Sequence, residues 1–459
     1  MWHAVHGVYY VLNVPTYLWE PDLTNYVIVG TGVTGIGAAE SIRSVDKNAS
    51  ITFIGDDPHG YYSRPGLAYC LTGEVDESLI FAYRPQDFKN LNAHFCRGTV
   101  IRIHDQQHQV ELSDGRFFSF DRLLLAVGSN AIRLSTPGAN SLGVVKLDHM
   151  DDARQIVSLS RHARTAVVVG GGITALELAE GLAARKVKVH LLIRTARYWS
   201  NVLDQVESEI IEHRLKEHGV TIHYQASLAN IIDKGGKVAG VRLESGEQIA
   251  CDLVAYGIGV KPRLTLARNA AIAFERGILV DERMCTNLPD IFAAGDVAQV
   301  YDPASNRSVI ESLWTPAKEQ GRVAGMNMAG QTRAYLKPVP FNVTRLAGLT
   351  TTIIGVVGSG QDGEPFLIAR GDSETWHDMP DAIIAQSGFD VNHLRLMVGN
   401  KNIVGAIVMG DQKLSSALQI IIRDKVDITP VRERLIAPNA PIADILADFW
   451  MKVHANPIN

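Results

Sequence analysis

A glycine-rich turn after a short apolar run is the stretch of this sequence best suited to bind a phosphate. Residues 26–29 lead into Gly30-x-Gly32-x-x-Gly35. In such a unit the first glycine makes a tight strand-to-helix turn, the second lets a pyrophosphate approach the backbone, and the third lets the helix pack closely on the strand. The N–H groups that begin the helix then face the phosphates. The sequence predicts a dinucleotide site here, and Val33 and Thr34 belong to the same turn.

An acidic residue stands where the ribose of such a nucleotide is bound. Residues 49–55 predict a second strand, and Asp56 follows it. The spacing from Gly35 is about 20 residues, at which a carboxylate binds a ribose hydroxyl. Its neighbour Asp57 is the alternative for the same role.

The turn recurs later in the chain. An apolar run at 166–169 leads into Gly170-x-Gly172-x-x-Ala175, with Ile173 and Thr174 between, 140 residues after the first turn. A small residue is accepted at the third position. Two such units in one chain are typical of an enzyme that holds two dinucleotides.

The end of the next strand bears on the choice of nicotinamide nucleotide. A strand is expected at 188–193, and an NAD site would offer an acid after it. The residue is Arg194, with Arg197 three residues on and Tyr198 as a stacking surface. A guanidinium can pair with a 2′-phosphate, which predicts a preference for NADPH. The alternative is a solvated arginine that is indifferent to the nucleotide.

A second carboxylate follows an apolar strand near residue 292. Gly295 and Asp296 come directly after it, so the Asp296 side chain can accept a hydrogen bond from a ligand hydroxyl at the strand end. The alternative is an aspartate that caps the next helix.

Composition limits the partners. The chain has 459 residues, a length typical of about three domains. Its net charge is −5, without runs of like charge, so neither nucleic acid nor an anionic membrane is expected. Four widely spaced cysteines argue against a disulfide framework or a zinc site and favour a reduced, cytoplasmic setting. No metal site is predicted, because His3 and His6 lack a third ligand.

The predicted organisation is α/β, with two Rossmann-like (doubly wound, three-layer) dinucleotide-binding domains and a C-terminal α+β module. Residues 1–22 form an appendage that resembles neither a signal peptide nor a membrane span. Residues 23–145 and 275–335 form the first nucleotide domain, 146–274 the second, and 336–459 the module, where strands precede helices at 415–423 and 442–453.

Together these motifs resemble the FAD-dependent pyridine nucleotide–disulfide oxidoreductase superfamily over about residues 25–330. Residues 62–65, 314–322 and 341–344 look most like the flavin subunit of NAD(P)H nitrite reductases and the rubredoxin and ferredoxin reductases. The Arg194 region is similar to NADPH-using glutathione reductases. The resemblance implies a homodimer formed through the C-terminal module.

The resemblance also implies the site residues. FAD would contact the first turn, a ribose-binding aspartate, two residues near the isoalloxazine, and two later strand ends: Gly30, Gly32, Val33, Thr34, Gly35, Asp56 or Asp57, Arg64, Pro65, Val100, Ala126, Gly128, Gly295 and Asp296. NAD(P) would contact Gly170, Gly172, Ile173, Thr174, Ala175, Glu177, Arg194, Arg197 and Gly259, with Glu177 near the nicotinamide. Val127 stands where the family has a threonine, which removes a hydroxyl.

The absent cysteines separate the functional hypotheses. Disulfide reductases of this superfamily carry a CxxxxC pair beside the flavin, and this chain has none. Cys70 is the candidate for a single catalytic cysteine, but it falls one residue late, about 100° around a helix. The first hypothesis is therefore electron transfer from NAD(P)H through FAD to an external acceptor. That acceptor would be a rubredoxin- or ferredoxin-like protein, a partner such as nitrite reductase, or a small molecule. The alternatives are an oxidase or CoA-disulfide/persulfide reductase that uses Cys70, and a non-enzymatic redox-sensing flavoprotein.

Overall fold

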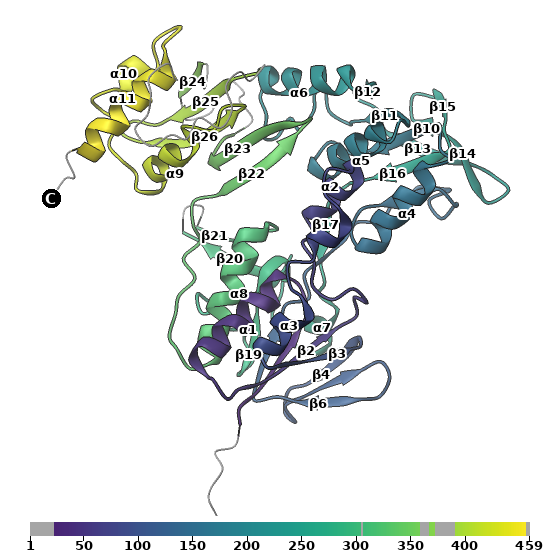
Figure 1. Ribbon diagram of the computed structural model, residues 1–459, viewed down its shortest axis with the longest axis vertical. Coiled ribbons are helices and arrows are strands. Elements are labelled where there is room, and N and C mark those ends of the chain that lie inside the picture. Colours follow the sequence, from purple (N-terminus) through teal and green to yellow (C-terminus); the bar gives the residue numbers. More distant parts are fainter. Residues whose placement is uncertain (1–22, 304–305, 359–366, 372–390, 456–459) are drawn as a thin grey trace, which may run out of the picture.

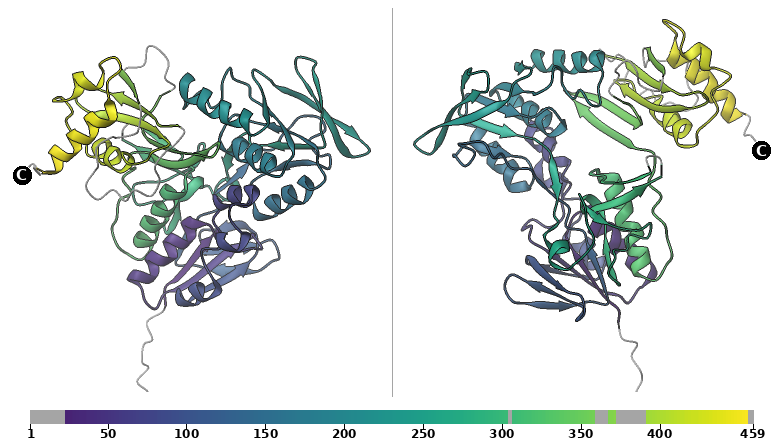
Figure 2. Two further views of the ribbon diagram at one scale, coloured as in Figure 1. Left: turned by 45° about the horizontal axis from the view of Figure 1, so that its top comes forward. Right: turned by 180° about the vertical axis from the view of Figure 1, so that it is seen from behind.

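Three sheets organise the protein. The computed structural model describes residues 23–303, 306–358, 367–371 and 391–455, and His3 and His6 lie outside this part. Two of the sheets are parallel and five-stranded, and the third is antiparallel and follows them in the chain. Figures 1 and 2 show the unit built on the first sheet below, with the second unit and the C-terminal unit above it. This confirms the predicted α/β class with two Rossmann-like units.

The first unit is a parallel sheet between two unlike layers. Its strand order is β19-β7-β1-β2-β3. Successive side chains of a strand face opposite sides. Ile28 therefore packs against helices α1 and α8, whereas Val27 packs against β4, β5 and α7. The elements are β1 (Asn25–Val29), α1 (Val33–Val45), β2 (Ser50–Gly55), α3 (Pro85–Asn90), β3 (Ala93–Arg97), β4 (Val100–His104), β5 (Gln109–Leu112), β6 (Phe117–Ser119), β7 (Arg122–Leu125), α7 (Thr265–Asn269), β18 (Ile278–Leu279), β19 (Ile291–Ala293), β20 (Ala298–Asp302), β21 (Arg307–Val309) and α8 (Trp314–Met328).

Helices α1 and α8 lie side by side although they are far apart in the sequence (Figure 1). Gly321 of α8 makes this packing close, since a Cβ at that position would lie 2.1 Å from the Thr34 carbonyl oxygen of α1. Only glycine fits. The contact brings residues 314–328 against the helix that begins at the first glycine turn.

The second unit repeats the parallel arrangement, with strand order β12-β11-β10-β16-β9. Val168 faces the helical layer, and Val167 faces a separate antiparallel sheet of β13, β14 and β15. The elements are β9 (Val144–Lys146), α4 (Met150–Ser160), β10 (Thr165–Val169), α5 (Ile173–Ala184), β11 (Lys188–Leu192), α6 (Gln205–Glu217), β12 (Val220–His223), β13 (Leu228–Lys234), β14 (Lys237–Leu243), β15 (Gln248–Ala250) and β16 (Leu253–Tyr256).

A strand pair and a helix contact are among the connections that join the two units. Strands β8 (Ser129–Ala131) and β17 (Val260–Pro262) pair antiparallel. Helix α2 (Gly66–Thr72) packs on α5 of the second unit, where a Cβ on Gly181 would lie 2.7 Å from the Leu71 Cβ. Leu67 and Leu71 are buried in the core of the second unit. Helix α2 lies in the chain segment predicted for the first unit, yet its apolar face is covered by the second.

The C-terminal sheet has the order β22-β23-β26-β25-β24. Its elements are β22 (Phe341–Leu346), β23 (Leu349–Gly355), β24 (Leu367–Gly371), β25 (His393–Val398), β26 (Ile403–Met409), α9 (Ser415–Arg423), α10 (Arg432–Leu435) and α11 (Ile442–Ala455). The two predicted helices are thus α9 and α11. None of the helices in the described ranges has the length and apolar content needed to cross a membrane.

A fully buried arginine fixes the C-terminal sheet to the second unit. Arg395 of β25 donates from Nε to Glu207 Oε1 of α6 at 2.8 Å, and from Nη2 to the Val202 carbonyl oxygen at 2.8 Å. Both charged groups are removed from water and satisfy each other, so loss of either partner would leave an uncompensated buried charge. This pair therefore resists separation of the two units.

Candidate functional site

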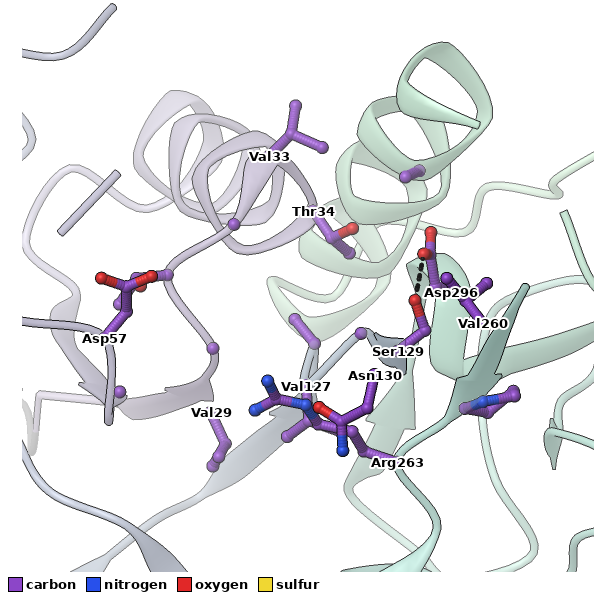
Figure 3. Close-up of a pocket in the computed structure, with 18 of the residues that line it drawn as sticks. Val29, Val33, Thr34, Asp57, Val127, Ser129, Asn130, Val260, Arg263 and Asp296 are labelled. Carbon is purple, nitrogen blue, oxygen red and sulfur yellow. Dashed lines mark hydrogen bonds between the residues drawn. The ribbon is translucent and has the colours of Figure 1, made fainter. Parts of the chain in front are cut away.

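A cavity of about 1190 Å³ lies at the carboxyl edge of the first parallel sheet (Figure 3). Three strands end at it, where β1 is followed by Gly30, β2 by Asp56, and β7 by residues 126–128. Ligands of parallel α/β sheets bind at this edge, because the loops that leave the strands and the helix N-termini converge there. The cavity therefore lies where the first glycine motif predicts a nucleotide.

The first turn can be made only by glycine. Gly30 has φ +118°, and a Cβ there would lie 2.1 Å from the Ala126 carbonyl oxygen. At Gly32 a Cβ would meet no atom within 4 Å, so this face of the backbone is open to a phosphate. Gly32 is also the N-cap of α1, whose first free N–H groups are available to the same ligand.

Two acids lie on opposite sides of the cavity: Figure 3 shows Asp57 on one side and Asp296 on the other. The Ser129 hydroxyl donates to Asp296 Oδ2 at 2.8 Å. Burial raises the pKa of Asp296, while the Ser129 hydrogen bond and the Arg64 charge oppose that shift. The Ser129 hydrogen bond therefore fixes the Asp296 side chain, which can still accept further hydrogen bonds from a ligand in the cavity.

The structure separates the roles of Asp56 and Asp57. Asp57 accepts from the His59 backbone N–H at 2.9 Å and from the Tyr62 hydroxyl at 3.0 Å, so both of its oxygens hold its own loop. Asp56 is half exposed, and its Oδ2 lies 3.7 Å from Arg263 Nη1. Of the two, Asp56 is the better placed to accept a ribose hydroxyl.

Most of the predicted first-site residues line the cavity together: Gly30, Gly32, Val33, Thr34, Asp56, Asp57, Arg64, Pro65, Val100, Ala126, Gly128 and Asp296. Gly35 and Gly295 shape the turns and are not among the lining residues. The Gly295 N–H donates to Gln320 Oε1 of α8 at 2.8 Å, which places Asp296.

Sequence reasoning missed many lining residues, among them Ser129, Asn130, Arg263 and Trp314. Ser129 and Asn130 belong to β8, and Arg263 follows β17. Their role depends on the pairing of β8 with β17, which joins segments 130 residues apart and leaves no local sequence signal.

The second glycine turn repeats the first. Gly170 has φ +143°, and a Cβ there would lie 2.3 Å from the Gly257 carbonyl oxygen. Gly172 is the N-cap of α5, and a Cβ on it would meet no atom within 4 Å. Ile173, Thr174 and Ala175 form the first turn of α5, and Gly259 follows the end of β16 at the same edge of this sheet. This geometry suits a second dinucleotide.

Two acids one turn apart on α5 share an apolar setting. Burial raises the pKa of Glu177 to about 7, and the Glu180 carboxylate adds to that shift. Burial also raises the pKa of Glu180 to about 7, against backbone hydrogen bonds from Ala347 and Gly348 and the charge of Arg345. Burial raises the pKa of the Tyr198 phenol, and the charges of Glu180 and Glu177 add to that shift. The Tyr198 hydroxyl has no hydrogen-bond partner among the described residues. Burial therefore favours the protonated forms of Glu177 and Glu180 up to near neutral pH.

The residues after β11 correct the expected nucleotide contacts. Arg194 is exposed at the strand end, as expected. Arg197 donates to backbone carbonyls of its own loop, from Nη2 to Ser200 O at 3.2 Å and from Nε to Leu203 O at 3.5 Å. Tyr198 is fully buried, so it offers no stacking surface. Arg194 is thus the more exposed of the two arginines, and the predicted stacking on Tyr198 is wrong because that ring is buried in the core.

Cys70 lies on α2, where the helix packs on α5. Burial raises the pKa of its thiol, and the acids Glu77 and Asp76 add to the shift. A raised pKa disfavours the thiolate, which is the reactive form. All four cysteines lie in the described part of the chain, and none lines the cavity.

The geometry agrees with what the chain is similar to. Residues 24–321 match the family model described as pyridine nucleotide-disulphide oxidoreductase. The chain is 33% identical over 334 residues to a rubredoxin-NAD(+) reductase of Pseudomonas putida, which covers 72% of this chain and 86% of that protein. It is 27% identical over 406 residues to a nitrite reductase [NAD(P)H] of Bacillus subtilis, covering 88% of this chain but only 48% of that protein. Among solved structures, a covalent putidaredoxin reductase–putidaredoxin complex superposes with a TM-score of 0.79 at 25% identity, over 93% of this chain and 98% of that one.

The raised pKa of Glu177 makes stability depend on pH. The folded state holds this proton up to about pH 7, whereas the unfolded chain releases it near 4.5, so stability falls as pH rises through that window. Glu177→Gln cannot ionise. We expect it to raise the melting temperature by roughly 2–4 °C at pH 8 and by less at pH 5.

Melting curves of the parent and Glu177→Gln across this pH range test the expectation. Glu244→Gln removes a carboxylate from an exposed turn and is the matched control. A gain that is the same at both pH values, or a loss at pH 8, would contradict a buried neutral Glu177.

Proposed function

Since the chain belongs to the pyridine nucleotide–disulphide oxidoreductase family, whose members are oxidoreductases that use FAD and NAD(P)H, we propose that it passes electrons from the nicotinamide through FAD to a separate redox protein, without a thiol intermediate. The observation that carries this proposal is a cavity lined by residues 30–34 of the first glycine turn and, within the described part of the chain, by no cysteine.

The residues present fit FAD. The open backbone at Gly32 would hold the diphosphate, and Asp56 would bind the adenosine ribose. Asp296, on the far side of the cavity, would accept from hydroxyls of the flavin side chain (Figure 3). When bound, FAD supplies the redox chemistry, accepting a hydride and releasing electrons. The protein holds the reactants in position.

The exposed mouth of the cavity favours a protein acceptor. Leu313 and Trp314 line the cavity and are 36% and 41% exposed. The Lys318 ammonium lies 5.7 Å from the centre of the Trp314 ring. An apolar rim with a nearby cation suits the surface of an acidic iron–sulfur or rubredoxin-like protein. The similar rubredoxin-NAD(+) reductase and the putidaredoxin complex point to the same class of acceptor.

A second candidate is the electron-input part of a larger reductase. The chain spans about half the length of the nitrite reductase that it matches, so a partner would supply the remaining chemistry. The Cys70 alternative is disfavoured by the position and the raised pKa of that thiol. A homodimer through residues 336–459 and a cytoplasmic location stay predictions.

We also propose a preference for NADPH, supported by the exposed Arg194 at the end of β11. A guanidinium can form charge-assisted hydrogen bonds with a 2′-phosphate but cannot accept a proton from a 2′-hydroxyl.

Cys70→Ser should leave NAD(P)H-dependent dye reduction within a few-fold of the parent, because electrons do not pass through the thiol. The assay compares initial rates per bound flavin in the two proteins. A loss of about 100-fold, some 2.7 kcal/mol of barrier, with the flavin content unchanged would favour the oxidase or disulfide-reductase alternative.

Arg194→Glu should reverse the nucleotide preference. We expect the parent to favour NADPH by about tenfold or more in kcat/KM, at least roughly 1.4 kcal/mol, and the variant to favour NADH. Steady-state rates with both nucleotides measure this. Arg242→Glu, an equal charge change at an exposed position of β14, is the control. A parent that prefers NADH, or treats the two alike, would show that Arg194 does not read the phosphate.

A further inference from the structure

Arg263 enters the cavity from the strand pair that joins the two units. It follows β17, and its backbone N–H donates to the Gly128 carbonyl oxygen at 3.0 Å. Gly128 lies just past β7, which is hydrogen-bonded to β1. The backbone of Arg263 is thereby fixed next to the strand ends that form the cavity, and its side chain lines the cavity with those of Val127 and Asn130 (Figure 3).

The guanidinium of Arg263 is incompletely paired. Its side chain is 25% exposed, and Nη1 lies 3.7 Å from Asp56 Oδ2, too far for a direct hydrogen bond. Its Nε is buried and has no hydrogen-bond partner among the described residues. The Nε is enclosed and beyond the reach of a ligand, so the partly exposed end of the guanidinium is the part that can donate into the cavity.

The charges around this end of the cavity indicate what the acceptor is. Asp56 and Asp57 are both acids that line the same cavity as the open backbone of Gly32. The N-terminus of α1 supplies only about half of a positive charge. A diphosphate bound here would therefore face two carboxylates with little compensation, and a cation between them and the ligand would offset the repulsion. The other basic residues that line the cavity, Arg64, Lys261, Arg268 and Arg276, are exposed.

We propose that Arg263 binds the adenosine diphosphate half of FAD, donating to its diphosphate while its pairing with Asp56 aims that carboxylate at the ribose. This inference rests on FAD as the occupant of the cavity. It makes the strand pair β8 and β17 part of the cofactor site, so that a residue on the link between the two units secures the cofactor of the first.

FAD binding by the apoprotein tests the assignment without any activity assay. Dissociation constants are obtained from the quenching of flavin fluorescence for the parent, Arg263→Met, Arg263→Lys and the control Arg102→Met, an exposed arginine on β4 of the same unit. We expect Arg263→Met to weaken FAD binding by about 10- to 100-fold, Arg263→Lys to weaken it less, and the control to match the parent.

Competition by ADP locates the contact. ADP carries the adenosine and diphosphate but no flavin, so Arg263→Met should weaken ADP competition by a factor similar to its effect on FAD. Unchanged FAD binding, or weaker FAD binding with unchanged ADP competition, would overturn the inference. Thermal unfolding of each apoprotein shows whether the variant folds. If Arg263→Met does not fold, the test is the FAD and ADP affinity of Arg263→Lys relative to the parent. A parent that binds no FAD would instead overturn the proposed function.

Discussion

The turn at Gly30, pressed against the carbonyl oxygen of Ala126, is the contact on which the nucleotide site depends. No side chain fits between the end of β1 and the end of β7, so the chain must turn at once into α1. The free N–H groups of α1 therefore open onto the cavity. Helix α8 packs on α1 at Gly321, and Gln320 next to it holds the Gly295 N–H. One tight turn thus sets the position of Asp296, more than 260 residues later.

The second unit has the same kind of tight turn at Gly170, and further contacts join it to the rest of the protein. Helix α2 and the turn between β22 and β23 both contribute to its core. Arg395 and Glu207 pair inside that junction, where water cannot compete. Relative motion of the units would expose this pair and the apolar faces around it. The structure therefore favours a rigid relation between the second unit and the C-terminal sheet.

The sequence predicted the parts of the site that are local in the chain. Both glycine turns, the acid after β2 and the arginine after β11 follow from residue type and spacing, and α9 and α11 follow from the periodicity of their apolar residues. The packing of α2 on α5 was not predictable, because it depends on Gly181, which has no distinctive neighbour in sequence. The burial of Tyr198 and the pairing of β8 with β17 likewise arise from contacts between distant segments.

Rapid mixing under anaerobic conditions tests the central claim that electrons leave the flavin for a protein acceptor. Flavin absorbance is followed first on mixing with NADPH or NADH, and then as the reduced protein meets a ferredoxin, a rubredoxin, O₂ or a disulfide. The account predicts that one nicotinamide nucleotide reduces the flavin and that an iron–sulfur or rubredoxin protein reoxidises it faster than O₂ or a disulfide does. Fast reoxidation by O₂ or a disulfide, with none by either redox protein, would contradict it.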